Sequence, residues 1–304
     1  MARTAAPGQT TGPPAGRVAR RRSTPRDWGS RNDPRECSDV TVGRRMWERI
    51  DELPGTPIDH VVRAGHVNRI ERDRMVMDDG VTACLADDHF HMTTTTGGAA
   101  RVLSRLEDYL QTEWPDLQVY LTTVTEQWAV ASICGPQCHR LVTGLCDDLD
   151  ADPQGFEFMT WRDAQIAGIP VRVFRISFTG ELSYEINIPA TYGLWLWEQV
   201  MSRGAQYGIT PYGTEAMHLL RAEKGFIIVG QETDGTVTPQ DLGLSGMLKK
   251  TGDFIGRRSL SRSDTARDDR KQLVGRLTDD PNFVRMGGAH VIAWDAEDAP
   301  PMPM

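Results

Sequence analysis

From residue 75 onward the chain alternates between two periodic patterns of hydrophobic and polar residues. The alternation typical of a strand marks residues 75–78, 81–85, 89–93, 119–124, 127–133, 169–178 and 182–188. Hydrophobic residues three or four positions apart, the spacing of an amphipathic helix, mark residues 102–110, 137–149, 194–207 and 213–224. Strands interrupted by helices, with hairpins among them, predict an α+β fold.

Two predicted hairpins carry acidic residues. The first, a strand–turn–strand pattern, displays Asp78 and Asp79 at its turn. The second covers residues 171–188, where alternation along the strand places Tyr184 on the opposite face from Glu185. These positions make the acids candidates for contact with a ligand.

A threonine run at residues 93–96, followed by Gly97-Gly98, precedes the first predicted helix. Hydroxyls and free backbone N–H groups at a helix start can hold an anion. The same residues also suit a plain helix cap, which is the interpretation that the bare motif favours.

The formal net charge of −8 over 304 residues conceals an uneven distribution. Residues 1–75 hold 15 Arg, no Lys and 10 acids, a net of +5, whereas residues 76–304 hold 19 basic and 32 acidic residues, a net of −13. Residues 1–40 include only four large apolar side chains, too few to offset the entropy of ordering. We therefore expect residues 1–40 to be a disordered Arg/Pro/Gly-rich segment and residues 41–74 to be divergent and poorly assignable.

Neither a nucleic acid nor a membrane is a predicted partner. The run Arg20-Arg21-Arg22 lacks the interleaved aromatic residues of a single-strand binding platform. No apolar run approaches the roughly 20 residues that span a bilayer, and the start of the chain lacks the apolar core of a signal peptide. The sequence therefore predicts a cytoplasmic protein.

The familiar motifs for metals, nucleotides and serine nucleophiles are missing. Cys134-x3-Cys138 has no second cysteine pair, and the pair His89 and His91 has no third ligand at a telling spacing. The sequence contains no Walker loop, no Gly-x-Gly-x-x-Gly after a strand and no Gly-x-Ser-x-Gly elbow. We predict no metal site and no flavin or NAD site in this chain.

The remaining candidates are Arg221 and the acids Asp78, Asp79, Glu185 and Glu223. A carboxylate beside a cationic carbon stabilises its charge and accepts a proton from an attacking amine. A carboxylate facing an aminopyrimidine edge accepts two N–H hydrogen bonds, and an arginine pairs with a ligand carboxylate. Taken singly, each residue is more often a solvated surface charge or a turn former, so both interpretations stay open here.

A set of longer motifs resembles one known family. They are residues 78–80, the run HMTTTTGGAARVL at 91–103, residues 109–117, 125–129, 179–185 and 209–215, LRAEKGF at 220–226, and GQETDGTVTPQDLG at 230–243. Together they resemble the carboxy-terminal, folate-binding part of the α subunit of heterotetrameric sarcosine oxidases. That part is itself similar to the glycine-cleavage T-protein (aminomethyltransferase) and to dimethylglycine oxidase, and the resemblance covers roughly residues 75–292.

The resemblance implies an aminomethyltransferase fold with a folate-binding domain at residues 75–258. It also implies a reaction in which a flavin on a different subunit oxidises an N-methyl amine to an iminium. Tetrahydrofolate then captures the one-carbon unit as 5,10-methylenetetrahydrofolate. The implied partners are folate and other sarcosine oxidase subunits.

The same resemblance assigns roles to five residues. Asp78 would be the catalytic acid near the folate nitrogen and the iminium carbon. Glu185 would hold the pterin edge, with Tyr184 as its neighbour, and Arg221 would bind the folate tail. Asp79 would complete the folate-binding set.

Two parts of the chain depart from the family pattern. Residues 1–74 lack the strand–helix segment and the Arg-Tyr-Gly run expected upstream, so we expect a misread or frameshifted remnant or a non-native fusion, which sequencing the coding DNA would decide. Residues 271–275 and 287–292 resemble the opening strands of a final β-barrel, so residues 268–304 are expected to be a truncated barrel domain. The amino-terminal dinucleotide-binding part of such α subunits has no counterpart.

Two classes of function therefore remain open. The first is an enzyme component that transfers a one-carbon unit to tetrahydrofolate within a sarcosine oxidase assembly, with a glycine-cleavage aminomethyltransferase as its closest variant. Residues 93–114 resemble the oxidase subunit more than the T-protein. The second is a non-catalytic, truncated folate-binding or interaction fragment, so the sequence alone does not decide whether the chain is an enzyme.

Overall fold

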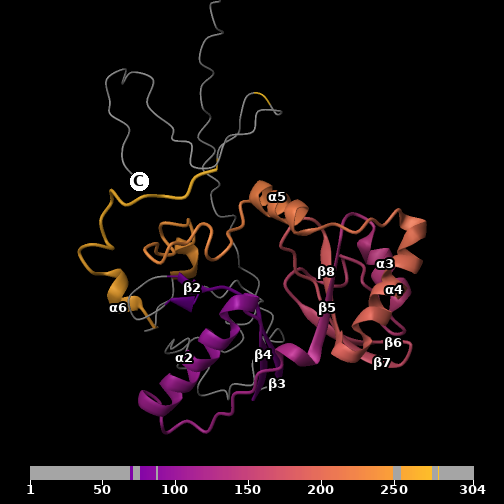
Figure 1. The fold of residues 1–304 in the computed structure, drawn as a ribbon, viewed down its shortest axis with the longest axis horizontal. Coiled ribbons are helices and arrows are strands. Elements are labelled where there is room, and N and C mark those ends of the chain that lie inside the picture. Colours follow the sequence, from indigo (N-terminus) through magenta and orange to yellow (C-terminus); the bar gives the residue numbers. More distant parts are fainter. Residues whose placement is uncertain (1–68, 71–75, 87, 249–254, 276–279, 281–304) are drawn as a thin grey trace, which may run out of the picture. The chain divides into compact units, whose positions relative to one another are not determined.

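The computed structural model describes residues 69–70, 76–86, 88–248, 255–275 and 280 (Figure 1). All helices and strands given below lie within one compact unit of the chain, Pro25–Leu273. Residues 1–68 and 281–304 are outside the described residues, so the domain boundaries expected from the sequence stay predictions.

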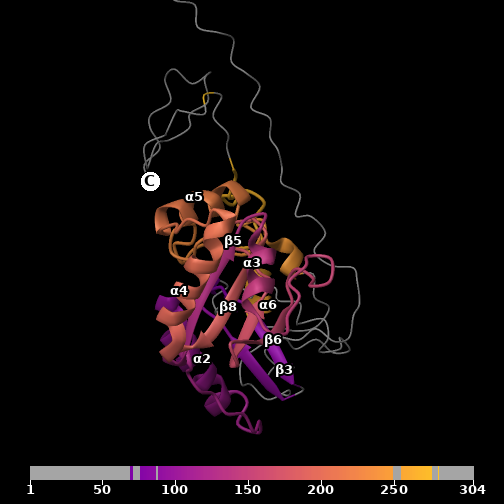
Figure 2. The same ribbon diagram turned by 90° about the vertical axis from the view of Figure 1, so that its right-hand side faces the viewer.

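The largest sheet in the described part has four antiparallel strands in the order β5-β8-β7-β6. The strands are β5 (Trp128–Cys134), β6 (Trp161–Ile166), β7 (Ile169–Phe174) and β8 (Ser183–Pro189), and Figure 2 shows β5 beside β8. Ala167 and Gly168 join β6 to β7 with φ of 51° and 73°, the left-handed pair typical of a tight hairpin turn. The strands predicted at 127–133 and 182–188 are confirmed, and the one predicted at 169–178 ends earlier, at Phe174.

One face of this sheet builds the main hydrophobic core. Tyr184, Ile186 and Ile188 of β8 are fully buried on it, and each buried isoleucine contributes about 2 kcal/mol of transfer free energy. Two adjacent helices, α3 (Cys138–Leu145) and α4 (Gly193–Gly204), cover this face (Figure 1) and supply Leu141, Val142, Leu145, Leu196 and Val200. The helix predicted at 137–149 is confirmed but ends earlier, at Leu145, and the one predicted at 194–207 is confirmed, with η5 (Ala205–Tyr207) following α4. A short η4 (Ala190–Tyr192) connects β8 to α4.

The chain does not form the hairpin predicted around the acidic pair. β2 (Val76–Asp78) pairs with β1 (Arg69–Ile70), whereas β3 (Thr82–Ala86) pairs with β4 (His89–Met92). In the segment between β2 and β3, Gly80 lies so close to Thr93 that a Cβ on Gly80 would be 2.0 Å from the Thr93 carbonyl oxygen. The next residue, Val81, exchanges hydrogen bonds with Thr93. The prediction is wrong because the backbone after the acidic pair bonds to the Thr93 segment rather than folding back on β2.

The helix predicted after the threonine run is confirmed as α2 (Ala99–Thr112), preceded by η2 (Thr96–Gly98). Its buried residues Val102 and Leu106 pack with Met77, and the stacked rings of Tyr109 and Trp114 are 4.9 Å apart. The strand predicted at 119–124 is not formed. These residues are irregular backbone, from which Val119 and Leu121 pack against the α2 cluster, and η3 (Thr125–Gln127) follows.

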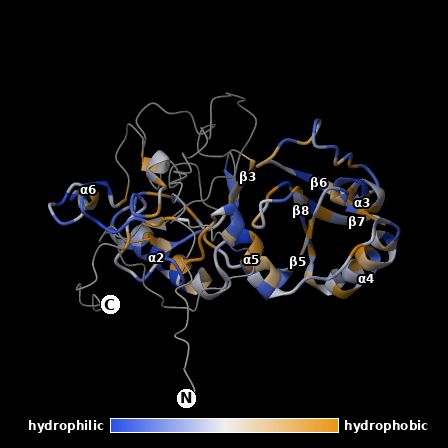
Figure 3. Ribbon diagram, turned by 90° about the horizontal axis from the view of Figure 1, so that it is seen from above, coloured by the Kyte–Doolittle hydropathy of each residue, from blue (hydrophilic) through white to orange (hydrophobic). Residues whose placement is uncertain are grey.

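The helix predicted at 213–224 is confirmed as α5 (Thr214–Lys224), which ends at Gly225 with φ of 87°. Hydrophobic and hydrophilic segments alternate along it (Figure 3). An irregular stretch leads to η6 (Ser245–Leu248), and α6 (Arg257–Leu260) lies beyond the next gap in the description. Residues 271–275 do not form the predicted barrel strand, and residues 287–292 are outside the described part.

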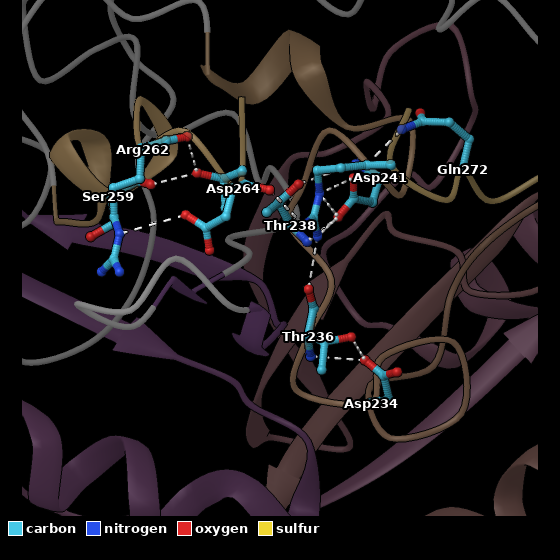
Figure 4. A network of polar contacts seen from close by, with 10 residues as sticks. Asp234, Thr236, Thr238, Asp241, Ser259, Arg262, Asp264 and Gln272 are labelled. Atoms are coloured by element: carbon cyan, nitrogen blue, oxygen red, sulfur yellow. Dashed lines mark hydrogen bonds and ion pairs between the residues drawn. The ribbon is translucent and has the colours of Figure 1, made fainter. Parts of the chain in front are cut away.

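A buried ion pair fastens the irregular stretch to the segment after α6 (Figure 4). Asp241 is 3% exposed and accepts hydrogen bonds from Arg270 Nη2 (2.6 Å) and from the Thr238 backbone N–H (2.8 Å). Arg270 Nη2 also donates to the Thr236 carbonyl oxygen at 2.9 Å. Burial opposes ionisation of Asp241, but the bonds from Arg270 and Thr238 outweigh it and lower the pKa of this carboxyl.

Candidate functional site

Asp78, the last residue of β2, is fully buried and its carboxylate is held by three donors. Oδ1 accepts from the backbone N–H groups of Asp79 (2.8 Å) and Thr95 (3.1 Å), and Oδ2 accepts from the Thr95 hydroxyl (3.2 Å). Thr95 also caps η2, because its Oγ1 accepts from the Gly98 N–H at 3.1 Å. The threonine run is therefore a helix cap, and it fixes Asp78 at the start of the helical segment.

Replacing Gly98 by alanine is expected to destabilise the protein and displace Asp78. A Cβ on Gly98 would lie 1.5 Å from Asp78 Oδ2, and overpacking of this kind costs about 1–3 kcal/mol in unfolding free energy. Gly97→Ala is the matched control, because its Cβ would meet nothing within 4 Å, and its effect should stay within about 0.5 kcal/mol. Urea unfolding measures both variants, and equal stabilities would contradict the close approach at Gly98.

Glu185 lies in β8, on the sheet face opposite the main core. Its direct neighbours across the strands are Ser132 in β5 and Phe174 in β7, and residues paired in this way point to the same face. No described residue donates a hydrogen bond to its carboxylate, and burial raises the pKa of Glu185 to about 7. The residue is half-buried, and a partly desolvated carboxylate without protein donors suits a ligand that supplies N–H groups.

Tyr184 does not share the face of Glu185. Its ring is fully buried in the main core, 5.7 Å from the ring of Phe156, and its hydroxyl donates to the Ala151 carbonyl oxygen. Side-chain alternation along β8 directs Tyr184 and Glu185 to opposite sides of the sheet. The structure therefore gives Tyr184 a packing role, and we leave it out of the proposed ligand site.

Arg221, in the last turn of α5, is 7% exposed and its guanidinium is already paired. Nη1 forms an ion pair with Glu232 Oε1 at 2.8 Å and donates to the Phe226 carbonyl oxygen at 3.0 Å, while Nη2 donates to Gln231 Oε1 at 2.6 Å. These contacts hold the segment after α5 against the helix. An internal carboxylate thus already pairs with this guanidinium, and binding of a folate tail by Arg221 stays a prediction.

The other two acids contribute less to the described site. Asp79 is half-buried, and its backbone N–H holds the Asp78 carboxylate. Glu223 is exposed on α5. A ligand contact by the Asp79 side chain stays a prediction.

A hydrophobic cluster links the segment after Asp78 to the strand beside Glu185. Val81 and Ala83, which follow the acidic pair, pack with Phe174. Phe174 is in turn the direct cross-strand neighbour of Glu185. The segment after Asp78 therefore packs on the sheet face that carries Glu185.

The sequence reasoning missed two rings on this face, Phe174 and His91. The His91 ring stacks on Phe174 with centroids 6.4 Å apart and meets the Trp128 ring edge-on at 6.1 Å. Burial, helped by the nearby charge of Arg172, lowers the pKa of His91 to about 4, so it is neutral at pH 7. The sequence indicates His91 only as a candidate metal ligand, although its place at the start of the motif at 91–103 is a signal for a different role.

A cavity of about 360 Å³ opens beside Arg172. The Arg172 guanidinium lies over the rings of Trp161 (5.0 Å) and Trp128 (6.0 Å) and pairs with Asp163 at 2.9 Å. The lining of this cavity includes neither Asp78 nor Glu185, so we do not assign it to the ligand predicted for them.

Within the described residues, no three His, Cys, Asp or Glu side chains are grouped so that they could hold a metal ion. No helix in that part of the chain is long and apolar enough to cross a membrane.

The protein family described as the GCVT N-terminal domain matches residues 66–252, more than half of the chain. The chain belongs to the GCVT N-terminal domain family. The matched GCVT range contains both Asp78 and Glu185, together with every strand and helix from β1 to α5.

Curated relatives of this GCVT chain carry two kinds of name. Sarcosine oxidase subunit alpha of Corynebacterium sp. (strain U-96) is 53% identical over 225 residues, which is 74% of this chain and 23% of the relative. An aminomethyltransferase of Streptomyces coelicolor is 26% identical over 247 residues, which is 78% of this chain and 64% of the relative. The resemblance predicted from the motifs is confirmed, and the chain spans about a quarter of the length of the sarcosine oxidase subunit.

The GCVT chain also resembles a solved structure. The crystal structure of glycine cleavage system aminomethyltransferase T from Bartonella henselae matches with a TM-score of 0.56 and 18% sequence identity, over 74% of this chain and 63% of that one. The predicted α+β fold of the aminomethyltransferase type is therefore confirmed.

Proposed function

We propose that this chain is the tetrahydrofolate-binding part of a sarcosine oxidase α-subunit-like protein. It would transfer the one-carbon unit of an oxidised N-methyl amine to tetrahydrofolate, giving 5,10-methylenetetrahydrofolate. The observation that carries the proposal is the half-buried carboxylate of Glu185 on the sheet face, which receives no hydrogen bond from the described residues. Membership of the GCVT family and the sarcosine oxidase relative support it.

The chemistry of Glu185 fits the pterin end of a folate. A 2-amino-4-oxopyrimidine edge presents two N–H donors side by side, and an ionised carboxylate accepts both in a bidentate arrangement. A ring that lacks these donors would cover the charge without pairing it, so the site would reject it. Glu185 would thus bind and orient the ligand.

Asp78 would act at the reacting nitrogen. The carboxylate is immobilised by the Asp79 and Thr95 backbone and by the Thr95 hydroxyl, so its position is fixed before a ligand arrives. A negative charge beside an iminium carbon stabilises the cation, and the same oxygen accepts the proton that the attacking amine loses. The partner subunits of the assembly would supply the oxidised amine.

A second candidate is an aminomethyltransferase. The Streptomyces coelicolor enzyme of that name shares 26% identity with this chain over 64% of its own length, a larger share than the 23% of the sarcosine oxidase subunit that is matched. In that case the group transferred to the folate would come from an aminomethyl donor, and the residues would keep the same roles.

Calorimetric titration of the full chain with tetrahydrofolate tests the proposal. We expect saturable binding, and about 100-fold weaker binding of an analogue that lacks the 2-amino group. Absence of tetrahydrofolate binding by the folded chain would refute the proposed function. Binding without product, once amine-oxidising subunits are added, would instead indicate the non-catalytic folate-binding fragment.

A further inference from the structure

The face of β8 opposite the main core is covered on both sides of Glu185 and open at that residue. Strand alternation directs Ser183, Glu185 and Asn187 to this face. Ser183 and Asn187 are each 4% exposed, whereas Glu185 between them is half-buried. Residues two apart on a strand are separated by about 7 Å, so a ligand bound at Glu185 lies directly beside Asn187.

The side chain of Asn187 is buried, and no residue in the described part of the chain forms a hydrogen bond with it. Amide side chains are mostly exposed, and those that are buried nearly always have a hydrogen-bond partner. An unpaired amide in this position loses its hydrogen bonds to water without replacement. Asn187 is thus a second polar group on this face, next to Glu185, that a ligand would satisfy.

Aromatic rings shield Asn187 from water. On the same face, Trp128 of β5 lies beside the end of β8, and Phe174 of β7 lies beside Glu185. The His91 ring contacts both, with centroid distances of 6.1 Å to Trp128 and 6.4 Å to Phe174. The line between those two rings crosses β8 in the row of Asn187, so His91 accounts for the burial of the amide.

The two direct cross-strand neighbours of Asn187 are Val130 on β5 and Arg172 on β7. Val130 has no polar atom in its side chain. Arg172 pairs with Asp163, to which its Nε donates at 2.9 Å, and its guanidinium lies over the Trp128 ring at 6.0 Å. The neighbours therefore enclose the amide without forming a hydrogen bond with it.

We propose that Asn187 is a second pterin-binding residue, whose amide donates a hydrogen bond to the 4-oxo oxygen of tetrahydrofolate while Glu185 accepts the two N–H bonds beside it. This inference rests on the proposed function. Along a 2-amino-4-oxopyrimidine edge the 4-oxo oxygen follows the two N–H donors, so a carboxylate followed by an amide matches the order of donors and acceptor. Asn187 would thus determine the specificity for a 4-oxo ring, a role that Glu185 cannot fill.

The experiment compares two ligands by calorimetry on the full chain, tetrahydrofolate and its 4-amino analogue, at about pH 8, where Glu185 is ionised. Asn187→Asp replaces a donor by an acceptor, which would face the 4-oxo oxygen of tetrahydrofolate but accept an N–H from the 4-amino group. The ratio of the two affinities should therefore shift by at least about tenfold toward the 4-amino analogue. A merely structural asparagine would change both affinities alike and leave the ratio unchanged.

Gln165→Glu is the matched control. It makes the same change from amide to acid on the same sheet face, at an exposed position of β6. Neither the affinity for tetrahydrofolate nor the ratio of the two affinities should change.

An unchanged ratio in Asn187→Asp overturns the inference, whatever the single affinities. If that variant does not fold, Asn187→Leu replaces it, and the second ligand is then an analogue that lacks the 4-oxo oxygen. The wild type should bind this analogue about threefold to tenfold more weakly than tetrahydrofolate, and Asn187→Leu should bind both equally. A preference for the 4-oxo ligand that Asn187→Leu retains also overturns the inference.

The same titrations separate this inference from the proposed function. Failure of the wild-type chain to bind tetrahydrofolate contradicts the proposed function itself. Binding by the wild type, with a ligand preference that no Asn187 variant alters, contradicts the role of Asn187 alone.

Discussion

Glu185→Gln is expected to weaken tetrahydrofolate binding by about 100-fold and to leave the fold intact. An ionised carboxylate accepts two N–H bonds, whereas an amide offers one acceptor and turns an NH₂ donor toward a ligand donor. A hydrogen bond to a charged group contributes about 1.5–3 kcal/mol, which corresponds to about 10-fold to 150-fold in affinity. Calorimetry at about pH 8, where the carboxylate is ionised, measures the difference most directly.

The pH dependence of binding gives an independent check. Because burial raises the pKa of Glu185 to about 7, the ligand must drive ionisation of the carboxyl below that pH. Affinity should therefore fall by up to about tenfold for each pH unit below 7 and level off above it. The same shift makes the free protein less stable as pH rises from about 4.3 through 7, and Glu185→Gln should remove that loss.

Glu181→Gln is the matched control for both measurements. It makes the same chemical change in the loop that precedes β8, at an exposed residue. Its affinity and pH profile should equal those of the wild type. Equal affinities of the wild type and Glu185→Gln, or a flat wild-type profile, would exclude Glu185 as the pterin-binding group.

The sequence predicted well those features that depend on local periodicity. Alternation along residues 182–188 was enough to separate the core face of Tyr184 from the face of Glu185, and the structure confirms that separation. Gly225, placed directly after the helical pattern of α5, predicted its end. Periodicity specifies these features because each depends only on neighbours in the chain.

Features that depend on distant partners were not predictable in the same way. The acidic pair resembles a hairpin turn, yet the next residues approach a distant segment: Val81 exchanges hydrogen bonds with Thr93, twelve residues away, and Gly80 lies close to the Thr93 carbonyl. Arg221 suited a ligand carboxylate, but Glu232 pairs with it inside the protein. Strand β6 was missed because its polar residues Arg162, Asp163 and Gln165 hide a pattern in which only Ala164 and Ile166 are buried. Charge and turn chemistry show which group is available, but tertiary packing decides its partner.

Arg270→Ala is expected to lower the free energy of unfolding by about 3 kcal/mol, the second large effect that the structure predicts. The substitution leaves Asp241, which is 3% exposed, without its ion-pair partner, and removing one partner of a buried pair is strongly destabilising. It also removes the hydrogen bond to the Thr236 carbonyl oxygen, and with it the contacts that join the irregular stretch after α5 to the segment after α6 (Figure 4). Urea unfolding near neutral pH measures the loss.

Arg267→Ala is the matched control, because it breaks an ion pair of similar geometry in a different environment. Arg267 and Asp269 are 60% and 70% exposed, and such surface pairs contribute about 0–1 kcal/mol, so little stability should be lost.

The stabilisation that Asp241 contributes also depends on pH. Its pKa is lowered in the folded state, so the stabilisation is present above the ordinary aspartate value of about 3.9 and is lost as pH falls further. The difference in unfolding free energy between the wild type and Arg270→Ala should therefore be largest at neutral pH and decrease below about pH 4. If there is no difference at pH 7, or if Arg267→Ala loses as much stability, the buried Asp241 pair does not stabilise this fold.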